Sequence, residues 1–215
     1  MNRGQDALFR RNVVGVSCVE FFWGLGFPIV LESTFLQLFL QALGASGFAI
    51  GVIPALFIFG ISCFPLFASY YSRNIRQRRT LVMVLHQISG AAVLLFGCAL
   101  LVVDAPSLIL PLFFLCYGLF SLCVGVTIPI WLNYLVRIFS DEKNVVGLGY
   151  MMLCQNIGKV ISSFFILKIV EMYAFSPRSS AMVFLATGLV FILGSLCFLI
   201  TREPVSEYPA VRDTR

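Results

Sequence analysis

Residues 108–136 read LILPLFFLCYGLFSLCVGVTIPIWLNYLV and contain no charged side chain. A transmembrane helix needs about 20 consecutive apolar residues to cross the ~30 Å hydrocarbon core of a bilayer, and this stretch is longer than that. Its apolar residues are continuous, whereas the strands of an outer-membrane barrel alternate apolar and polar residues in short segments. The stretch therefore predicts a helix that crosses a membrane.

Five further apolar stretches have the same character, and a polar or turn-forming segment closes each one. They lie at roughly residues 12–40, 48–71, 80–103, 145–170 and 181–200. Together with residues 108–136, they predict an all-α integral membrane protein with six transmembrane helices. The expected organisation is a short segment at 1–11, a six-helix bundle at 12–200 and a polar tail at 201–215.

The first apolar stretch differs from a cleaved signal peptide. It is too long, it contains Glu20 and Glu32, and no small-residue cleavage site follows at the expected distance. We therefore expect a retained helix that tilts or bends, with the bend near Gly24, Gly26 and Pro28.

The composition of the whole chain excludes an ordinary water-soluble domain. Residues of the set AVILMFWYC make up 60% of the 215 residues and charged residues make up 12%, against about 45–50% and about 25% in soluble domains. A water-soluble protein of this size could not hide that much apolar surface. The formal net charge of +5 does not indicate nucleic-acid binding, because the basic residues lie in short turns between apolar stretches.

Residues that usually hold metals or catalyse reactions are sparse in this sequence. The seven cysteines lie in apolar stretches and form no C-x-x-C pair, so we expect them to be packing residues. The single histidine, His86, has no evident partner for a metal site. A phosphate-binding glycine loop and an H-E-x-x-H motif are also absent from the sequence. The sequence therefore predicts no enzyme activity, no metal and no cofactor.

The distribution of lysine and arginine predicts the orientation of the helices, since these residues concentrate in cytoplasmic loops. If the N-terminus lies inside, twelve of the fifteen basic residues fall in inner segments. These twelve are Arg3, Arg10, Arg11, Arg73, Arg76, Arg78, Arg79, Arg137, Lys143, Arg202, Arg212 and Arg215. Both termini are therefore expected in the cytoplasm, in a multi-pass protein of the cell membrane (the inner or plasma membrane).

Short motifs between and within the spans carry a family resemblance. They are Leu43-Gly-Ala-Ser46 followed by Ile50-Gly-Val-Ile-Pro-Ala-Leu56, the turn Ser140-Asp-Glu-Lys143 with Gly147 beyond it, and Thr201-Arg-Glu-Pro204. With six spans, a basic turn after the second and a charged turn after the fourth, the chain resembles the N-terminal half of a major facilitator superfamily transporter. The resemblance implies two inverted three-helix repeats and transport of a small solute by alternating access.

The turn after the second span departs from the pattern of that family, which reads roughly G-x-x-x-D-R-x-G-R-R. With the last two basic residues of the pattern aligned on Arg78 and Arg79, Asn74 stands where the aspartate is expected. The basic residues remain, and they either anchor the topology or help to close the cytoplasmic side; they are Arg73, Arg76, Arg78 and Arg79. The fourth span also lacks an intramembrane arginine and the fifth lacks a Gly-Pro motif, which argues against a proton-driven drug exporter.

Lys159 lies near the middle of the fifth span, where an ionisable side chain costs roughly 2.5–3.5 kcal/mol to insert and is a functional candidate by default. Gln155 and Asn156 precede it by four and three residues, so the three form a polar stripe on one helix face. The stripe predicts a contact with an anionic solute or a coupling ion inside the bundle. The alternative is a structural buried pair, or a lysine that snorkels to the interface.

Glu20, on the first span, is the expected partner of Lys159. Counted from the inner ends of their spans, their depths differ by roughly 9 Å, a gap that a long lysine and a water can close. Pairing would offset the burial of both charges. Glu20 is a candidate for solute or proton binding, or else a helix anchor near the inner boundary. Glu32 is either a further candidate or a carboxylate at the level of the lipid headgroups.

The sequence therefore predicts one half of a secondary transporter that moves a small solute across the cell membrane. Superfamily members have two six-helix halves with the solute site between them, and this chain ends where the loop that joins the halves is expected. The expected partners are the lipid bilayer, the solute and a second six-helix half, either another copy or a separately encoded chain. The alternative is a non-transporting six-helix protein, such as an accessory subunit or the remnant of a split transporter gene.

Overall fold

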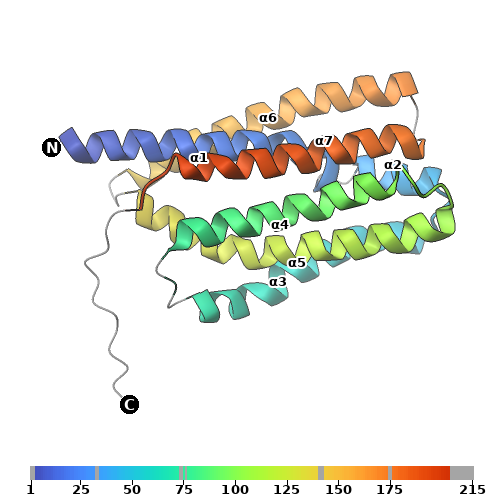
Figure 1. Cartoon of the computed structure of the whole chain (residues 1–215), viewed down its shortest axis with the longest axis horizontal. Coiled ribbons are helices and arrows are strands. Elements are labelled where there is room, and N and C mark those ends of the chain that lie inside the picture. The colour runs from blue at the N-terminus through green and yellow to red at the C-terminus, as the bar shows by residue number, and fades with distance from the viewer. Residues whose placement is uncertain are drawn as a thin grey trace, which may run out of the picture.

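The computed structural model describes residues 3–31, 34–72, 75, 77–139, 143–173 and 176–203, and in these ranges every regular element is a helix. The helices are α1 (Arg3–Val30), α2 (Thr34–Ala42), α3 (Gly47–Ser72), α4 (Arg78–Ala99), α5 (Pro106–Ile138), α6 (Asn144–Tyr173) and α7 (Pro177–Ser195), followed by the 3₁₀ helix η1 (Leu196–Leu199). The six long helices lie side by side, and successive ones run in opposite directions (Figure 1).

Among the residues that the structure describes, six helical segments are long and apolar enough to cross a membrane, which confirms the number of spans that the sequence predicts. They contain 22 to 33 residues each, whereas about 20 residues suffice for the hydrocarbon core. Each overlaps one of the apolar stretches of the sequence, because a segment in lipid has to satisfy its backbone hydrogen bonds internally and the helix does so.

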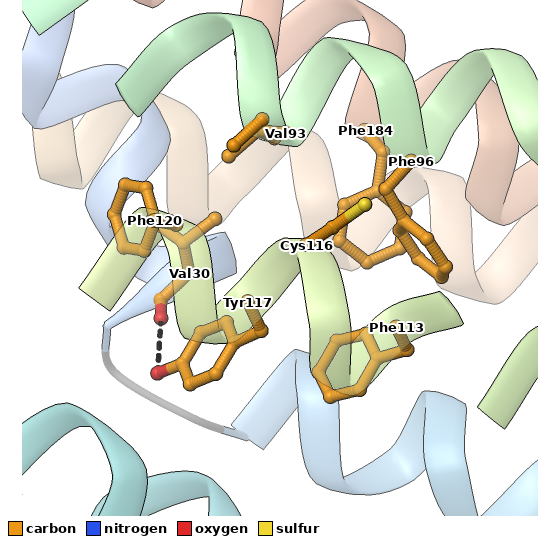
Figure 2. Close-up of a pocket in the computed structure, with 9 residues that line it drawn as sticks. Val30, Val93, Phe96, Phe113, Cys116, Tyr117, Phe120 and Phe184 are labelled. Carbon is orange, nitrogen blue, oxygen red and sulfur yellow. Dashed lines mark hydrogen bonds between the residues drawn. The ribbon is translucent and has the colours of Figure 1, made fainter. Parts of the chain in front are cut away.

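The first expected span, residues 12–40, is two helices rather than one. α1 begins at Arg3, continues past Pro28 and ends at Val30, and α2 begins at Thr34. Pro28 has no N–H to donate to the preceding turn, which weakens the helix there. The hydroxyl of Tyr117 on α5 donates to the carbonyl of Val30 at 3.1 Å (Figure 2). That bond satisfies one of the carbonyls that a helix end leaves without an intrahelical partner.

Gly24 and Gly26 lie inside α1, which is helical over both positions, and their role is close packing. A Cβ at Gly24 would meet the backbone of Gln155 on α6, and a Cβ at Gly26 would meet the ring of Phe191 on α7. Small residues let membrane helices approach one another at backbone distance. α1 is therefore fixed against two neighbours at its middle.

The six long helices pack in the order α3–α5–α4–α7–α1–α6, so that α3 and α6 form the two edges of the bundle. Figure 1 shows these two helices on opposite sides. Glycines make both edge contacts close: a Cβ at Gly158 of α6 would meet the backbone of α1, and one at Gly60 of α3 would lie 2.5 Å from the carbonyl oxygen of Ser121 on α5. The edge helices are the two least buried of the six.

Aromatic rings fill the bundle beside α2. Phe39 of α2, Phe96 of α4, Phe113 of α5 and Phe184 of α7 have ring centroids 4.8 to 6.3 Å apart. Phe96, Phe113 and Phe184 also line a cavity of about 20 Å³, enough for about one water molecule, and Figure 2 shows its apolar wall. This region is a packed core with no room for a solute.

Candidate functional site

A larger cavity, of about 190 Å³, lies between α1, α3, α4, α5 and α6. Its lining residues are Glu20, Trp23, Phe27, Leu31, Phe57, His86, Val124, Thr127, Ile128, Trp131 and Gln155; we call it the Glu20 pocket. Gln155 is the twelfth residue of α6, which places it roughly 16 Å from the start of that helix, about half of a ~30 Å hydrocarbon core. The pocket therefore lies near the middle of the candidate spans that contain Glu20 and Gln155.

Glu20 is the acidic side chain of this pocket. It is 4% exposed, and its carboxylate accepts a hydrogen bond from the side-chain amide of Gln155 at 2.5 Å. The two residues meet because Gly24 and Gly158 bring α1 and α6 to backbone contact. A carboxylate has about four acceptor positions, and among the described residues Gln155 fills one of them.

Two indole rings and two phenyl rings form much of the wall. Trp23 is 6% exposed, stacks on Phe191 at 4.3 Å and meets the edge of Phe27 at 5.9 Å between ring centroids. Trp131 of α5 and Phe57 of α3 also line the pocket. The indole N–H groups of Trp23 and Trp131 are buried, and neither has a hydrogen-bond partner among the described residues. Buried tryptophan N–H groups usually have one.

His86 lines the pocket. Its ring lies between those of Trp23 and Phe198, whose centroids are 4.7 and 5.0 Å away. Its Nδ1 is 2.7 Å from the carbonyl oxygen of Val82, one turn earlier on α4. That distance fits an Nδ1–H that donates to the carbonyl, which leaves Nε2 as an acceptor. Within the part of the chain that the structure describes, no group of three His, Cys, Asp or Glu side chains converges to hold a metal.

The residues of the polar stripe predicted on α6 have different environments in the structure. Gln155 faces α1 and contacts Glu20, whereas Asn156 is exposed. The ammonium of Lys159 lies 5.3 Å from the ring centroid of Phe27, and Phe27 is seven residues beyond Glu20, roughly 10 Å along α1. The shared site of Glu20 and Lys159 stays a prediction. Glu32 lies outside the described residues.

The basic turn before α4 is described only in part, since Arg73 and Arg76 lie outside the described residues. Arg79 joins the start of α4 to the segment after η1: its backbone N–H donates to the carboxylate of Glu203, and its guanidinium donates to the carbonyl of Thr201 at 3.0 Å. The Nε of Arg78 is buried without a partner among the described residues. The structure therefore gives Arg79 an anchoring contact.

A second polar contact at this end of the bundle involves Asn12, which the sequence analysis did not single out. Asn12 is 0% exposed, and its amide donates to the carbonyls of Ile138 at 3.0 Å and Arg202 at 3.1 Å. Its carbonyl accepts from the N–H of Arg202 at 2.8 Å. Asn12 thus ties α1, α5 and the segment after η1 together, and the ion pair of Lys143 with Asp6 ties α6 to α1 nearby.

The sequence singles out Glu20 and Gln155 as candidates, but it does not single out the aromatic residues that form the rest of the pocket lining. Trp23, Phe27 and Trp131 are apolar or amphipathic residues in apolar stretches, so their pattern does not differ from that of packing residues. The one available signal was the rarity of tryptophan, since the sequence contains two and both line this pocket.

Comparison with known families gives one finding. The family model described as Major Facilitator Superfamily matches residues 14–214, which include every residue that lines the Glu20 pocket. Comparison with curated proteins and with solved structures finds no match.

Proposed function

Because this chain belongs to the major facilitator superfamily, we propose that it is one six-helix half of a secondary transporter and that the Glu20 pocket is one wall of its solute site. The observation that carries the proposal is the buried carboxylate of Glu20 in a pocket near the middle of the candidate spans. Ionisable side chains inside a membrane are rare and mark the paths of substrates and ions. Transporters of this superfamily bind their solute near the midplane.

The packing order supports an arrangement of two three-helix repeats. The first repeat would be α1, α3 and α4, and the second α5, α6 and α7. Exchanging α1 with α5, α3 with α6 and α4 with α7 converts the order α3–α5–α4–α7–α1–α6 into the same order read backwards. Successive long helices run in opposite directions (Figure 1), so helices three spans apart are antiparallel, as in an inverted repeat.

Glycine positions support the same arrangement. Gly60 on α3 and Gly158 on α6 are each pressed against the backbone of the neighbouring helix, α5 and α1 respectively. Gly90 on α4 and Gly188 on α7 are each pressed against the helix that corresponds to their own. Both pairs are 98 positions apart in the sequence. Close contacts therefore recur at corresponding places in the two proposed repeats.

The size of the pocket is the reason for proposing a second half. Its volume of about 190 Å³ is below the ~300–1,000 Å³ of ordinary ligand sites, and in this superfamily the solute site lies between two six-helix halves. The second half would be another copy of this chain or a separately encoded six-helix chain. The weakly buried edge helices α3 and α6 are the surfaces that we assign to that contact.

The ends of the bundle support the proposed orientation. The bonds of Asn12 with Arg202 hold the first helix and the segment after η1 at the same end. That end also carries Arg79, Lys143 and Arg137, which belong to the group of basic residues that the positive-inside rule places in the cytoplasm. We therefore propose that both termini are cytoplasmic and that the protein spans the cell membrane.

Water accessibility of Thr127 tests the assignment of the solute site. After replacement of the seven native cysteines, Thr127→Cys should react with N-ethylmaleimide in membranes, because the thiolate that reacts forms in water. Thr187→Cys is the matched control: both hydroxyls bond the carbonyl four residues earlier and both side chains are buried, but only Thr127 lines the pocket. Equal protection of both cysteines would contradict a solute path through the pocket.

A further inference from the structure

We propose that the Glu20 pocket takes a small organic ammonium ion that also carries an acceptor oxygen, an inference that rests on the solute site proposed above. The charge of the pocket is the first reason. Among its lining residues, Glu20 is the one acidic side chain, and lysine and arginine are absent from the lining. A cation can offset the burial of this carboxylate, whereas an anion would be repelled by it.

The aromatic wall is the second reason. Indole and phenyl faces attract ammonium groups, and tryptophan does so most strongly. Trp23, Phe27 and Trp131 line the pocket together with Glu20, so the carboxylate and the rings can contact one cation from different sides. The ring of Phe27 also contacts the ammonium of Lys159, 5.3 Å from its centroid, although Lys159 is not among the residues that line the pocket.

The indole N–H groups are the third reason. Those of Trp23 and Trp131 are buried without a partner among the described residues, and both side chains line the pocket. An unpaired buried donor is unfavourable, and a hydroxyl or carbonyl oxygen on the ligand would satisfy one of them. The ligand class is therefore a hydroxylated or acylated ammonium ion rather than a purely apolar cation.

An anionic solute at Lys159 is the competing assignment. Lys159 is not among the residues that line the pocket, and its ammonium lies roughly two helical turns beyond Glu20 along α1. An anion that reached the pocket would face Glu20. The geometry therefore favours a cation as the solute.

Tryptophan fluorescence can measure binding directly, because the chain contains two tryptophans and both line the pocket. Choline is the probe, and 3,3-dimethylbutan-1-ol, which has the same shape without the charge, is the matched control. Choline should change the emission of the purified full chain in a saturable way, and the neutral alcohol should have no saturable effect. Glu20→Gln should weaken choline binding by at least roughly tenfold. Glu171→Gln, which changes an exposed carboxylate on the same helix as Gln155, should leave it unchanged.

A second measurement keeps Glu20 intact, in case Glu20→Gln fails to fold. Choline should protect Thr127→Cys from N-ethylmaleimide, and 3,3-dimethylbutan-1-ol should not. Equal effects of choline and the alcohol in both measurements, or unchanged choline binding by folded Glu20→Gln, would overturn the assignment of an ammonium ligand. Labelling of Thr127→Cys without protection by choline would overturn the ligand class and leave the solute site standing. Absence of labelling would overturn the solute site itself.

Discussion

Glu20 and Asn12 are both polar side chains buried on α1, and they differ in how far their hydrogen-bonding capacity is used. Asn12 uses both ends of its amide in three bonds to the backbone of Ile138 and Arg202. Glu20 has one bond, from Gln155, and lines a pocket. A polar side chain whose capacity is filled fixes the fold, whereas one with unused capacity beside a cavity is available to a ligand.

Replacing Asn12 should destabilise the bundle. Asn12→Ala would leave the N–H of Arg202 and two carbonyls without this partner, at a cost of about 1–3 kcal/mol for an unsatisfied buried group. Thermal unfolding in detergent can be measured through the reactivity of the native cysteines. The unfolding midpoint of Asn12→Ala should be lower than that of the unchanged protein. Asn156→Ala, at an exposed position on α6, is the control and should change stability by less than about 0.5 kcal/mol. Equal midpoints for the two variants would contradict the role of Asn12.

Replacing Gln155 should destabilise the protein through Glu20. Gln155→Met removes the donor to the buried carboxylate, and hydrogen bonds to charged groups contribute about 1.5–3 kcal/mol. Glu20→Gln should reduce the effect of Gln155→Met, because a neutral amide is less costly to leave unpaired than a carboxylate. Unfolding midpoints of the two single variants and the double variant form a cycle. Strict additivity would show that the two side chains do not interact.

At the scale of single elements, continuity of apolar sequence predicted six spans because lipid requires long uninterrupted helices. The first predicted span shows the limit of this rule: residues 12–40 are predominantly apolar, yet α1 ends at Val30, shortly after Pro28, and α2 begins at Thr34. The hydroxyl of Tyr117 on α5 donates to the carbonyl of Val30 at the end of α1. α1 also begins at Arg3, before the predicted span, and its first turns are polar. Sequence periodicity does not record contacts between distant helices.

The candidate site was likewise predictable from the sequence only in part. Glu20 and Gln155 were recognisable one at a time, because charged and amide side chains stand out in apolar stretches. Their pairing depends on the close contact of α1 with α6 at Gly24 and Gly158. Glycines in membrane helices predict close packing in general, but the sequence does not state which helix each one meets.

The close contact between α1 and α6 should be sensitive to a single methyl group. Gly158→Ala places a Cβ against the backbone of α1, and overpacking of this kind costs about 1–3 kcal/mol. Gly149→Ala on the same helix meets nothing within 4 Å and should stabilise the helix by about 0.5–1 kcal/mol. Unfolding midpoints should therefore shift in opposite directions. A shift in the same direction for both would contradict the close packing at Gly158.

For the whole molecule, the proposed half-transporter has a defined orientation, with both termini in the cytoplasm, and this orientation can be tested. A reporter that is active only outside the cytoplasm should be silent when fused after Arg79, Lys143 or Arg215. It should be active after Ser46, Pro106 or Ser176, because successive spans alternate in direction. Activity after Arg215 would mean an odd number of spans and would contradict cytoplasmic termini.

The central claim is that the Glu20 pocket is one wall of a site completed by a second six-helix half. Cross-linking in native membranes tests it most directly, through single cysteines at the exposed edge positions Leu66 and Phe67 of α3 and Phe164 and Phe165 of α6, in a background without native cysteines. Two neighbouring positions on a helix point in directions about 100° apart, so each pair covers two sides of its helix. We expect a cross-linked species of about twice the 23.9 kDa chain mass or more. A chain that stays at 23.9 kDa from all four positions, and still carries choline into liposomes as a monomer, would contradict it.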